Sequence, residues 1–322
     1  MMTRSELAIR PILVVGDANA DLVLGGDVVP RFGQAEQLLD RADLVLGGSA
    51  SIVACGTARL DAPTSLIARV GRDAFGDVTL AALRTRCVDV TDVIIDDTMA
   101  TGLSVILSGR DDRAILTALG TIPTLTGTDV TARLDSWQGP PGVLHVASYF
   151  LQPALAADLP AVFSHARRRG WTTSLDTNWD PAEQWRGIAD VLPHLDVLMP
   201  NGSELRALAA TLGEAGDCDE DLARGIARHG PRVVVKDGAR GGWSIGDGGH
   251  VERAPGLPVD VVDTTGAGDS FDAGYLAALA HGVDDESRRL RWAATCGSLS
   301  TTQPGGTAAQ ASLAELMGAM AS

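Results

Sequence analysis

The 322-residue sequence contains a single lysine, Lys236. A Walker A loop needs a lysine in the pattern GxxxxGK[ST], and a protein kinase needs a strand lysine beside its own glycine-rich and catalytic loops. Lys236 lies in the segment VVVKDG, which fits neither pattern. The sequence therefore excludes both of these protein classes.

Cysteine and histidine are also scarce, and their spacing matches no metal-binding motif. The six histidines form no HExxH pair, and the four cysteines form no CxxC or CxxH pair. These spacings give no support for a zinc site. The cysteines are typical of reduced thiols, so we expect a cytoplasmic location. The four are Cys55, Cys87, Cys218 and Cys296.

Long apolar runs and an excess of positive charge are missing too. No apolar stretch approaches the roughly 18 residues of a membrane-spanning helix, and the N-terminus lacks the apolar core of a signal peptide. The formal net charge of −15 disfavours binding to nucleic acid or to anionic lipid. We therefore expect small molecules as partners, with no nucleic acid and no membrane among them. A local positive pocket for a nucleotide is compatible with this charge.

What the sequence does contain is a regular alternation of strand-like and helical stretches. Apolar strand-like runs lie at 12–15, 65–68, 143–146, 172–175, 197–199 and 233–235. Helical stretches rich in alanine and leucine lie between them, at 154–169, 204–212 and 221–229. This order predicts βαβ units around a buried, mostly parallel sheet. The 45% of hydrophobic residues is enough to fill its core.

Two stretches, 21–46 and 98–124, break this alternation because they lack long helical periodicity. The second contains TGLSVILSG and RAILTAL, which predict short strands of an antiparallel pair. We therefore expect an α/β core made of 1–20, 47–97 and 125–322, with a small β element made of the two stretches. On the residues alone, this element could equally be two surface hairpins.

The most informative segment is DTTGAGDSF, at 263–271. It follows a valine-rich stretch at 259–262 that predicts a strand, and it opens an apolar-periodic stretch that predicts a helix. Gly266 and Gly268 would let backbone N–H groups approach a phosphate at the helix N-terminus. Asp269 would repel that phosphate, unless it takes a proton from a hydroxyl group that attacks the phosphate. The segment predicts phosphoryl transfer to an alcohol, and its alternative is an ordinary helix cap.

Polar residues after the first strand suit a polyol. Asn19 and Asp21 are two apart in an extended segment, so their side chains point to the same side and can bond neighbouring hydroxyl groups. The carboxyl end of a parallel strand is also where α/β sheets bind ligands. The alternative for these residues is a role in a turn. A dinucleotide-binding oxidoreductase would carry GxGxxG here, and that pattern is missing.

The segments from Gly16 to Gly306 resemble the ribokinase, or PfkB, family of carbohydrate kinases, and they follow the order of its motifs. DTTGAGDSF resembles the family's C-terminal signature, and GGSASIVA, which begins at Gly47, resembles its other signature. The resemblance implies a ribokinase-like three-layer α/β/α fold, with a mostly parallel central sheet and a small β-sheet lid over the substrate. Such a lid often forms a dimer contact in the family, which implies a homodimer.

The resemblance also assigns roles to individual residues. Asp269 is implied as the catalytic base, and the N–H groups of Gly266, Ala267 and Gly268 as the group that binds the anion. The residues implied to bind the substrate, together with Asp269, are Asn19, Asp21, Gly47, Gly48 and Ile52. Those implied to bind the nucleotide are Asn201, Lys236, Gly238, Arg240, Gly241 and Gly268. On the residues alone, Lys236 and Arg240 could instead be surface turn residues.

Two cation sites are implied as well. Glu204 forms the pattern NxxE with Asn201, and the resemblance implies that it holds Mg²⁺ through water. The same pattern is also that of a helix capping box. Asp263, Thr265 and Gly306 are implied to hold a monovalent cation such as K⁺.

Ile52 departs from the family pattern, which carries asparagine at this position. Isoleucine cannot bond a substrate hydroxyl group, and a missing buried partner costs about 1–3 kcal/mol. One interpretation is a substrate that presents an apolar or differently placed group. The other is that Ile52 packs in the core while Ser49 or Ser51 supplies the hydrogen bond.

Together these patterns predict an ATP-dependent sugar kinase, which transfers the γ-phosphate of ATP to a hydroxymethyl group with Mg²⁺ as cofactor. A nucleoside kinase of the adenosine or pseudouridine type, from the same family, is one alternative. A non-catalytic ligand-sensing relative is another, although the intact Asp269 argues against it.

Overall fold

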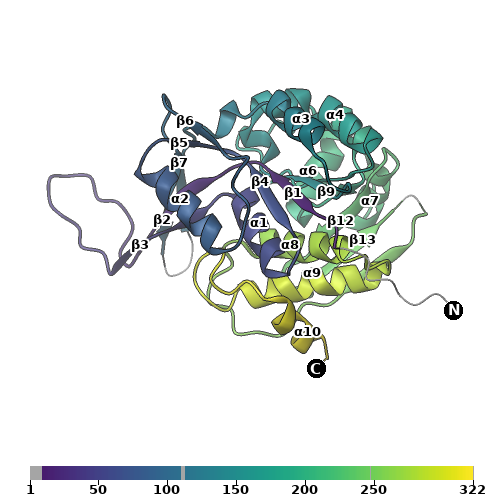
Figure 1. Cartoon of the computed structure of the whole chain (residues 1–322). Helices are drawn as coiled ribbons and strands as arrows, with labels where there is room; N and C mark the ends of the chain where they lie inside the picture. The colour runs from purple at the N-terminus through teal and green to yellow at the C-terminus, as the bar shows by residue number, and fades with distance from the viewer. Residues whose placement is uncertain (1–8, 110–112, 247, 322) are drawn as a thin grey trace.

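The computed structural model describes residues 9–109, 113–246 and 248–321. Its centre is an eight-stranded sheet in the order β14-β13-β12-β11-β10-β9-β1-β4 (Figure 1). The parallel strands are β1 (Ile12–Val15), β4 (Thr64–Ile67), β9 (Val143–Val146), β10 (Thr172–Leu175), β11 (Val197–Leu198) and β12 (Arg232–Lys236). Two antiparallel strands, β13 (Gly242–Ile245) and β14 (Val251–Ala254), complete one edge. The parallel strands are short and mostly buried, as expected when helices cover both faces.

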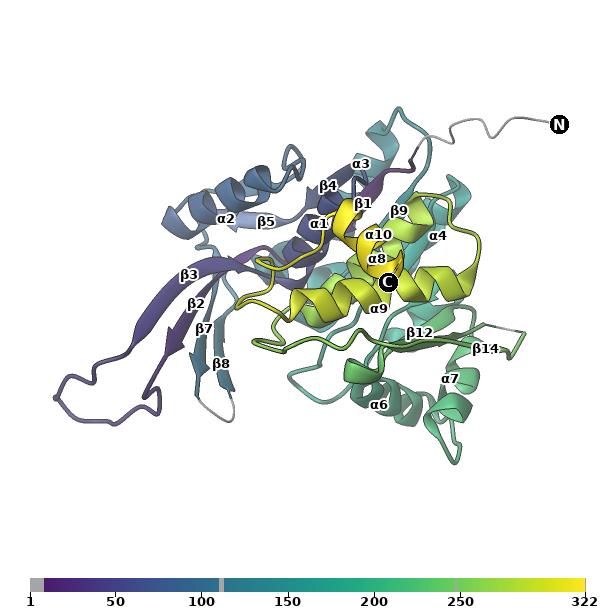
Figure 2. The same ribbon diagram turned by 90° about the horizontal axis from the view of Figure 1, so that it is seen from below.

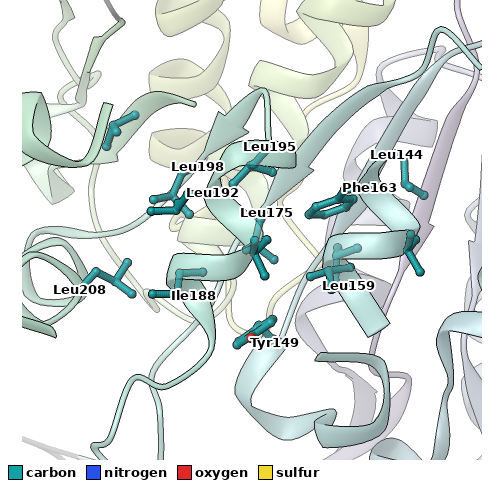
Figure 3. Packing of buried hydrophobic residues seen from close by; sticks show 14 of the residues in the cluster. Leu144, Tyr149, Leu159, Phe163, Leu175, Ile188, Leu192, Leu195, Leu198 and Leu208 are labelled. Carbon is teal, nitrogen blue, oxygen red and sulfur yellow. The ribbon is translucent and has the colours of Figure 1, made fainter. Parts of the chain in front are cut away.

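Helices cover both faces of this sheet, which gives the three layers that the sequence predicts. One face packs against α3 (Gly127–Ser136), α4 (Pro153–Arg168), α5 (Ile188–Val191), α6 (Gly202–Leu212) and α7 (Asp219–Ala227). Figure 3 shows this apolar layer, in which Leu159 and Phe163 of α4 lie near Leu144 and Leu175 of the sheet. The other face packs against α1 (Ser49–Arg59), α2 (Ala74–Thr85), α8 (Ala267–Ala280) and α9 (Glu286–Ser300).

The last helix, α10 (Leu313–Ala321), packs on the outside of α8 and α9. Short 3-10 turns lie at Ile122–Thr124, Tyr149–Leu151, Leu192–His194 and Gly238–Arg240. Among the helices that the structure describes, none is both long and apolar enough to cross a membrane. The architecture confirms the predicted α/β fold class.

Two smaller sheets flank the large one. A four-stranded sheet has the order β3 (Arg41–Gly47), β2 (Asn19–Gly25), β7 (Gly102–Ser108), β8 (Arg113–Ala118), and it extends away from the body of the molecule (Figure 2). β7 and β8 are antiparallel, which confirms the predicted pair. β5 (Arg69–Gly71) and β6 (Ile94–Asp96) form a further two-stranded parallel sheet that the sequence did not predict.

The valine-rich stretch at 259–262 is not a strand, so this prediction is wrong. It belongs to an irregular segment, in which Val261 and Val262 are 61% and 62% exposed. The N–H groups of Val262 and Asp263 both donate to the carbonyl oxygen of Thr301, at 2.8 and 3.1 Å. The segment is therefore fixed to the end of α9, and its valines face outward instead of entering a sheet.

Close packing joins α1 to α8 on the second face. A Cβ atom placed on Gly56 of α1 would lie 2.6 Å from the Cβ atom of Ala273 on α8. Gln310 also connects these helices, because its Nε2 atom donates to the carbonyl oxygen of Ile52 at 2.8 Å and to Oγ of Ser270 at 3.3 Å. The distance between α1 and α8 therefore depends on a residue without a side chain.

We expect Gly56→Val to lower the free energy of unfolding by about 1–3 kcal/mol, because the added atoms overlap α8. Gly318→Ala is the control, since nothing lies within 4 Å of the Cβ atom that it adds to α10. Thermal denaturation should show a lower midpoint for Gly56→Val and an unchanged or slightly higher one for Gly318→Ala. Equal midpoints for Gly56→Val and the parent chain would contradict the close contact.

Candidate active site

The carboxyl ends of the parallel strands meet at one edge of the large sheet. β1 lies between β9 and β4. The connection from β1 to β4 therefore runs to one side of β1, and the later strands, from β9 onward, lie on its other side. Such a switch point leaves a crevice that α/β proteins use to bind ligands. The segments after β1, β9, β10 and β11 bring Asn19, Ser148, Asn178 and Asn201 to this edge, and Lys236 is the last residue of β12.

The N-terminus of α8 points into this edge. Gly266 precedes the helix with a φ of 69°, a left-handed conformation that favours glycine. It lies directly against Gly306, because a Cβ atom on Gly266 would be 2.7 Å from Cα of Gly306. The N–H group of Ala267 donates to the carbonyl oxygen of Thr264 at 3.2 Å. Of the three predicted anion donors, Ala267 therefore has a protein acceptor in this structure.

Asp269 lies in the first turn of α8, partly buried, and is connected to two other elements. Its carboxylate accepts a hydrogen bond from Oγ of Ser49, the first residue of α1. Nδ2 of Asn178 donates to the same hydroxyl at 3.2 Å, and Oδ1 of Asn178 accepts from the N–H group of Ser148 at 2.8 Å. Burial raises the pKa of Asp269 to about 7, against the opposing effect of the Ser49 hydrogen bond. A carboxylate with such a pKa can accept a proton near neutral pH.

Asn19, Asp21, Gly47 and Gly48 form one compact group. Nδ2 of Asn19 donates to Oδ1 of Asp21 at 2.8 Å, and both side chains are buried. A Cβ atom on Gly47 would lie 2.0 Å from Oδ1 of Asp21, so these backbones approach each other only because position 47 is glycine. Burial, followed by the charge of Asp17, raises the pKa of Asp21 to about 7.

Asp17 is a structural residue of the site that the sequence did not single out. Its carboxylate accepts hydrogen bonds from the N–H groups of Ser49 and Ala50, at 3.1 and 2.9 Å, and so caps α1. Burial raises its pKa. The only signal in the sequence was an acidic residue between a strand and the polar pair at 19 and 21. By fixing the start of α1, Asp17 determines where the Ser49 hydroxyl lies.

Ile52 is buried and faces the loop that follows α9. A Cβ atom on Gly306 would lie 2.6 Å from Cδ1 of Ile52, so the isoleucine side chain lies against the glycine that also supports Gly266. The polar group that α1 presents to Asp269 is the hydroxyl of Ser49. Of the two interpretations of Ile52, the geometry favours packing, with Ser49 as the residue that supplies a hydrogen bond.

Lys236 lies between two buried carboxylates. Its Nζ atom is 2.6 Å from Oδ2 of Asp176 and 3.2 Å from Oδ2 of Asp272. Burial acts to raise the pKa of Asp176, but the Lys236 ammonium group and the hydrogen bond from Asp272 outweigh it, so the pKa lies below its usual value. Burial raises the pKa of Asp272 well above its usual value. Asp272, three residues after Asp269 on α8, was not identified from the sequence.

Asn201 and Glu204 form a capping box at the start of α6, which was one interpretation of their spacing. Oε2 of Glu204 accepts from the N–H group of Asn201 at 2.8 Å, and Oδ1 of Asn201 accepts from that of Glu204 at 3.0 Å. Glu204 is only 5% exposed, and burial and then the charge of Asp176 raise its pKa to about 7. A buried carboxylate in such surroundings favours a cation, so the capping role and a metal role are compatible.

A cavity of about 480 Å³ lies beside the N-terminus of α8. Its walls include Lys236, Gly238, Gly241 and Gly268 from the predicted nucleotide group. Other parts of its wall, among them Gly297 and Ser298, were not identified from the sequence. Arg240 does not line this cavity: its side chain is 81% exposed and pairs with Asp237. Asn201 is not part of its wall either.

Asp263, Thr265 and the loop before Gly306 come together behind the α8 N-terminus. The carboxylate of Asp263 accepts from the N–H group of Thr265 at 2.9 Å, from its hydroxyl at 2.7 Å and from the N–H group of Gly305 at 2.9 Å. In the described part of the chain, no set of three or more histidine, cysteine, aspartate or glutamate side chains is arranged to hold a metal ion. A cation at either predicted site would therefore need oxygen ligands from outside these side chains.

Comparison with known proteins identifies the family. Residues 10–312 match the model of the pfkB family carbohydrate kinases. A fructokinase from Klebsiella pneumoniae is 31% identical, over 91% of this chain and 94% of its own length. An ATP-dependent ribose-1-phosphate kinase from Halopiger xanaduensis is also 31% identical, over 92% and 94%.

Solved structures agree with this match. A fructokinase double mutant from Vibrio cholerae O395, in its fructose, ADP and potassium ion bound form, superposes with a TM-score of 0.81 at 26% identity, over 98% of this chain and 99% of that one. Arabidopsis thaliana ribokinase complexed with ribose and ATP has the same fold, with a TM-score of 0.82 at 24% identity, over 97% and 98%.

The fold and the site thus define a phosphotransferase with an alcohol group as acceptor. The chain belongs to the pfkB family of carbohydrate kinases.

We expect Asp269→Asn to raise the thermal midpoint at pH 8. The folded-state pKa of Asp269 is about 7, above its ordinary value of 3.8, so the folded state loses stability as the pH rises from about 4 to 7. The amide removes that loss, and the gain should shrink towards pH 4 and disappear near pH 3, where the acid is mostly protonated in both states. Asp284→Asn, at an exposed residue beyond the other end of α8, is the control. A gain that is equal at pH 4 and pH 8 would contradict the raised pKa.

Proposed function

We propose that this protein is an ATP-dependent sugar kinase, which transfers the γ-phosphate of ATP to a hydroxymethyl group of a free sugar or a sugar-like compound. One observation carries the proposal: a carboxylate, Asp269, lies in the first turn of α8 and is fixed there by the Ser49 hydroxyl. Relatives that match along nearly their whole length include fructokinases and a ribose-1-phosphate kinase, which supports a sugar as acceptor.

Asp269 acts as the general base in this proposal. The acceptor hydroxyl takes a place next to the Asp269 carboxylate, where Ser49 now donates, and gives up its proton as it attacks the phosphorus atom. Asn178 keeps the Ser49 hydroxyl in place. Phosphoryl transfer has a loose transition state, so the protein contributes mainly by aligning the two reactants.

The N-terminal turn of α8 binds the transferred phosphoryl group. The N–H groups of Gly266, Ala267 and Gly268 lie at the positive end of the helix dipole, where an anion is favoured. Ala267 would exchange its bond with Thr264 for one to the phosphate. These backbone donors replace the lysine that other phosphate-binding loops use.

The nucleotide occupies the cavity beside Lys236, Gly238 and Gly241, with its phosphates directed towards Gly268. Asn201 and Glu204 are close enough to the Lys236 end of β12 to act on the phosphates, since Asn201 and Lys236 pair as backbone neighbours. Glu204 would hold Mg²⁺ through water, and the bound ion would offset phosphate charge. The buried carboxylate with its raised pKa fits a cation.

Asp263, Thr265 and Gly306 would hold a monovalent cation such as K⁺ behind α8. The potassium-bound fructokinase from Vibrio cholerae supports such a site in a relative. The hydrogen bonds that the Asp263 carboxylate accepts from Thr265 and Gly305 already join the two loops that would surround the ion. A cation there would act through the position of Gly266, which lies against Gly306.

Asn19, Asp21, Gly47 and Gly48 bind the sugar hydroxyl groups, and the small β element formed by 21–46 and 98–124 acts as a lid that excludes water. Its strands carry apolar side chains that are largely exposed. These are Leu44, Ile115 and Leu116, at 43%, 54% and 60%. Exposed apolar residues on one sheet support a homodimer formed through the lid. The free cysteines at 55, 87, 218 and 296 suit a cytoplasmic enzyme.

An acceptor screen tests the function. Coupled ADP release should occur with at least one of ribose, fructose, 2-keto-3-deoxygluconate or an inositol, and Asp269→Asn should lower kcat by about 10²–10⁴-fold while it retains ATP binding. Asp284→Asn is the matched control and should keep the parent rate. Release with adenosine or pseudouridine alone would instead indicate a nucleoside kinase, and ATP binding without ADP release in every case would indicate a ligand sensor.

We expect kcat/KM for the sugar, at saturating MgATP, to rise with pH and to level off above about 7. The reason is that Asp269 must be deprotonated to accept a proton, and its pKa is about 7. The rate at pH 6 should be roughly a tenth of that at pH 8. Asp269→Asn should show a low rate without this rise. A parent profile that is flat from pH 5 to 8 would contradict the assignment of the base.

A further inference from the structure

Lys236, the sole lysine of the chain, forms ion pairs with two carboxylates, those of Asp176 and Asp272. Its side chain is 11% exposed, and the side chains of Asp176 and Asp272 are 1% and 0% exposed. The Nζ distances of 2.6 and 3.2 Å are those of charge-assisted hydrogen bonds. Removal of one member of such a buried group leaves an uncompensated charge, which is strongly unfavourable.

The lysine also contacts the segment that carries Asp269. A Cβ atom on Gly268 would lie 3.5 Å from Cδ and 3.8 Å from Nζ of Lys236, so the lysine side chain lies beside the residue that precedes Asp269. Asp272, on the same helix, follows Asp269 by nearly one turn. Lys236 therefore contacts α8 on both sides of the proposed base.

The charged groups that act on Asp269 come from four elements. They are Asp17 after β1, Asp176 after β10, Lys236 at the end of β12 and Asp272 on α8. Within the described residues, Lys236 is the only cation among the groups that shift the pKa of Asp269. Burial raises the pKa of Asp272 well above its usual value, whereas Lys236 acts to lower it. Lys236 therefore offsets the negative charge of the aspartates around Asp269.

We propose that Lys236 is a positioning residue for phosphoryl transfer: its contacts with Asp176 and Asp272 hold the first turn of α8, and with it Asp269, and its charge offsets the carboxylates beside which ATP binds. Its ammonium group acts through these two aspartates and is not a direct phosphate ligand. This inference rests on the proposed function for its catalytic readout.

The substitution Lys236→Met, compared with the loss of an ion pair elsewhere in the chain, tests this positioning role. We expect kcat to fall about 10²-fold, since a displacement of about 1 Å at a reacting group has this effect. The midpoint of the kcat/KM profile should move up by about one pH unit, because one cation near Asp269 is lost. Arg133→Met is the matched control: it breaks the Arg133–Asp92 pair, also 2.6 Å long, on α3. An unchanged kcat and pH midpoint in Lys236→Met would overturn the proposal.

The double variant Lys236→Met/Asp176→Asn separates charge from position. It removes one charge of each sign, so the pH midpoint and the Kd for ATP should return towards the parent values. The value of kcat should remain low, because α8 has lost its contact with the strand. The double variant also carries the test if Lys236→Met does not fold, since it leaves no unpaired charge at these two positions. A parent-like kcat in the double variant would overturn the positioning role.

ATP binding, measured by calorimetry, distinguishes a failure of this inference from a failure of the proposed function. Lys236→Met should weaken ATP binding about tenfold, and the double variant should restore it. If no acceptor supports turnover in the parent chain, the proposed function fails while this binding cycle still tests the charge role of Lys236. Equal Kd values in the parent chain and Lys236→Met would overturn that role.

Discussion

The contact between α1 and α8 is the interaction on which the site depends. Ser49 and Asp269 are 220 positions apart, and they meet because Gly56 lets α8 approach α1 closely. Asp17 then fixes the start of α1, so the Ser49 hydroxyl points at the Asp269 carboxylate. The position of the proposed base is therefore set by helix packing and by one cap, and not by the glycine turn alone.

Local patterns were enough to predict the fold class and the start of α8, because both depend on short-range features. Apolar runs over 12–15 and 143–146 became parallel strands, and Gly266 precedes the helix as a glycine turn requires. The prediction failed at 259–262, where valine content indicated a strand. Hydrogen bonds to Thr301, a residue far along the chain, decide the conformation there, and no local pattern contains them.

The site itself could be predicted only where a motif names the residue. Asp269, Asn201 and Glu204 stand in motifs, and the structure brings them to the same edge of the sheet. The pairing of Lys236 with Asp176 and Asp272 spans 60 and 36 positions, and no motif records it. Arg240 also belongs to a motif-like loop, and in this structure its side chain is exposed and pairs with Asp237.

The buried carboxylates of the site lower the free energy of unfolding at neutral and higher pH, and a bound ligand can offset this loss. Asp21, Glu204 and Asp269 all have a pKa of about 7, so the folded chain keeps protons that the unfolded chain releases above about pH 4. The raised pKa values of these three groups therefore make the free protein less stable at pH 8 than at lower pH. A cation that binds only the folded state stabilises it by mass action, and it does so most where Glu204 is ionised. In the proposed function, the acidity that lowers the stability of the free protein at high pH is thus the property that favours a metal ion at this site, in a chain with a single lysine.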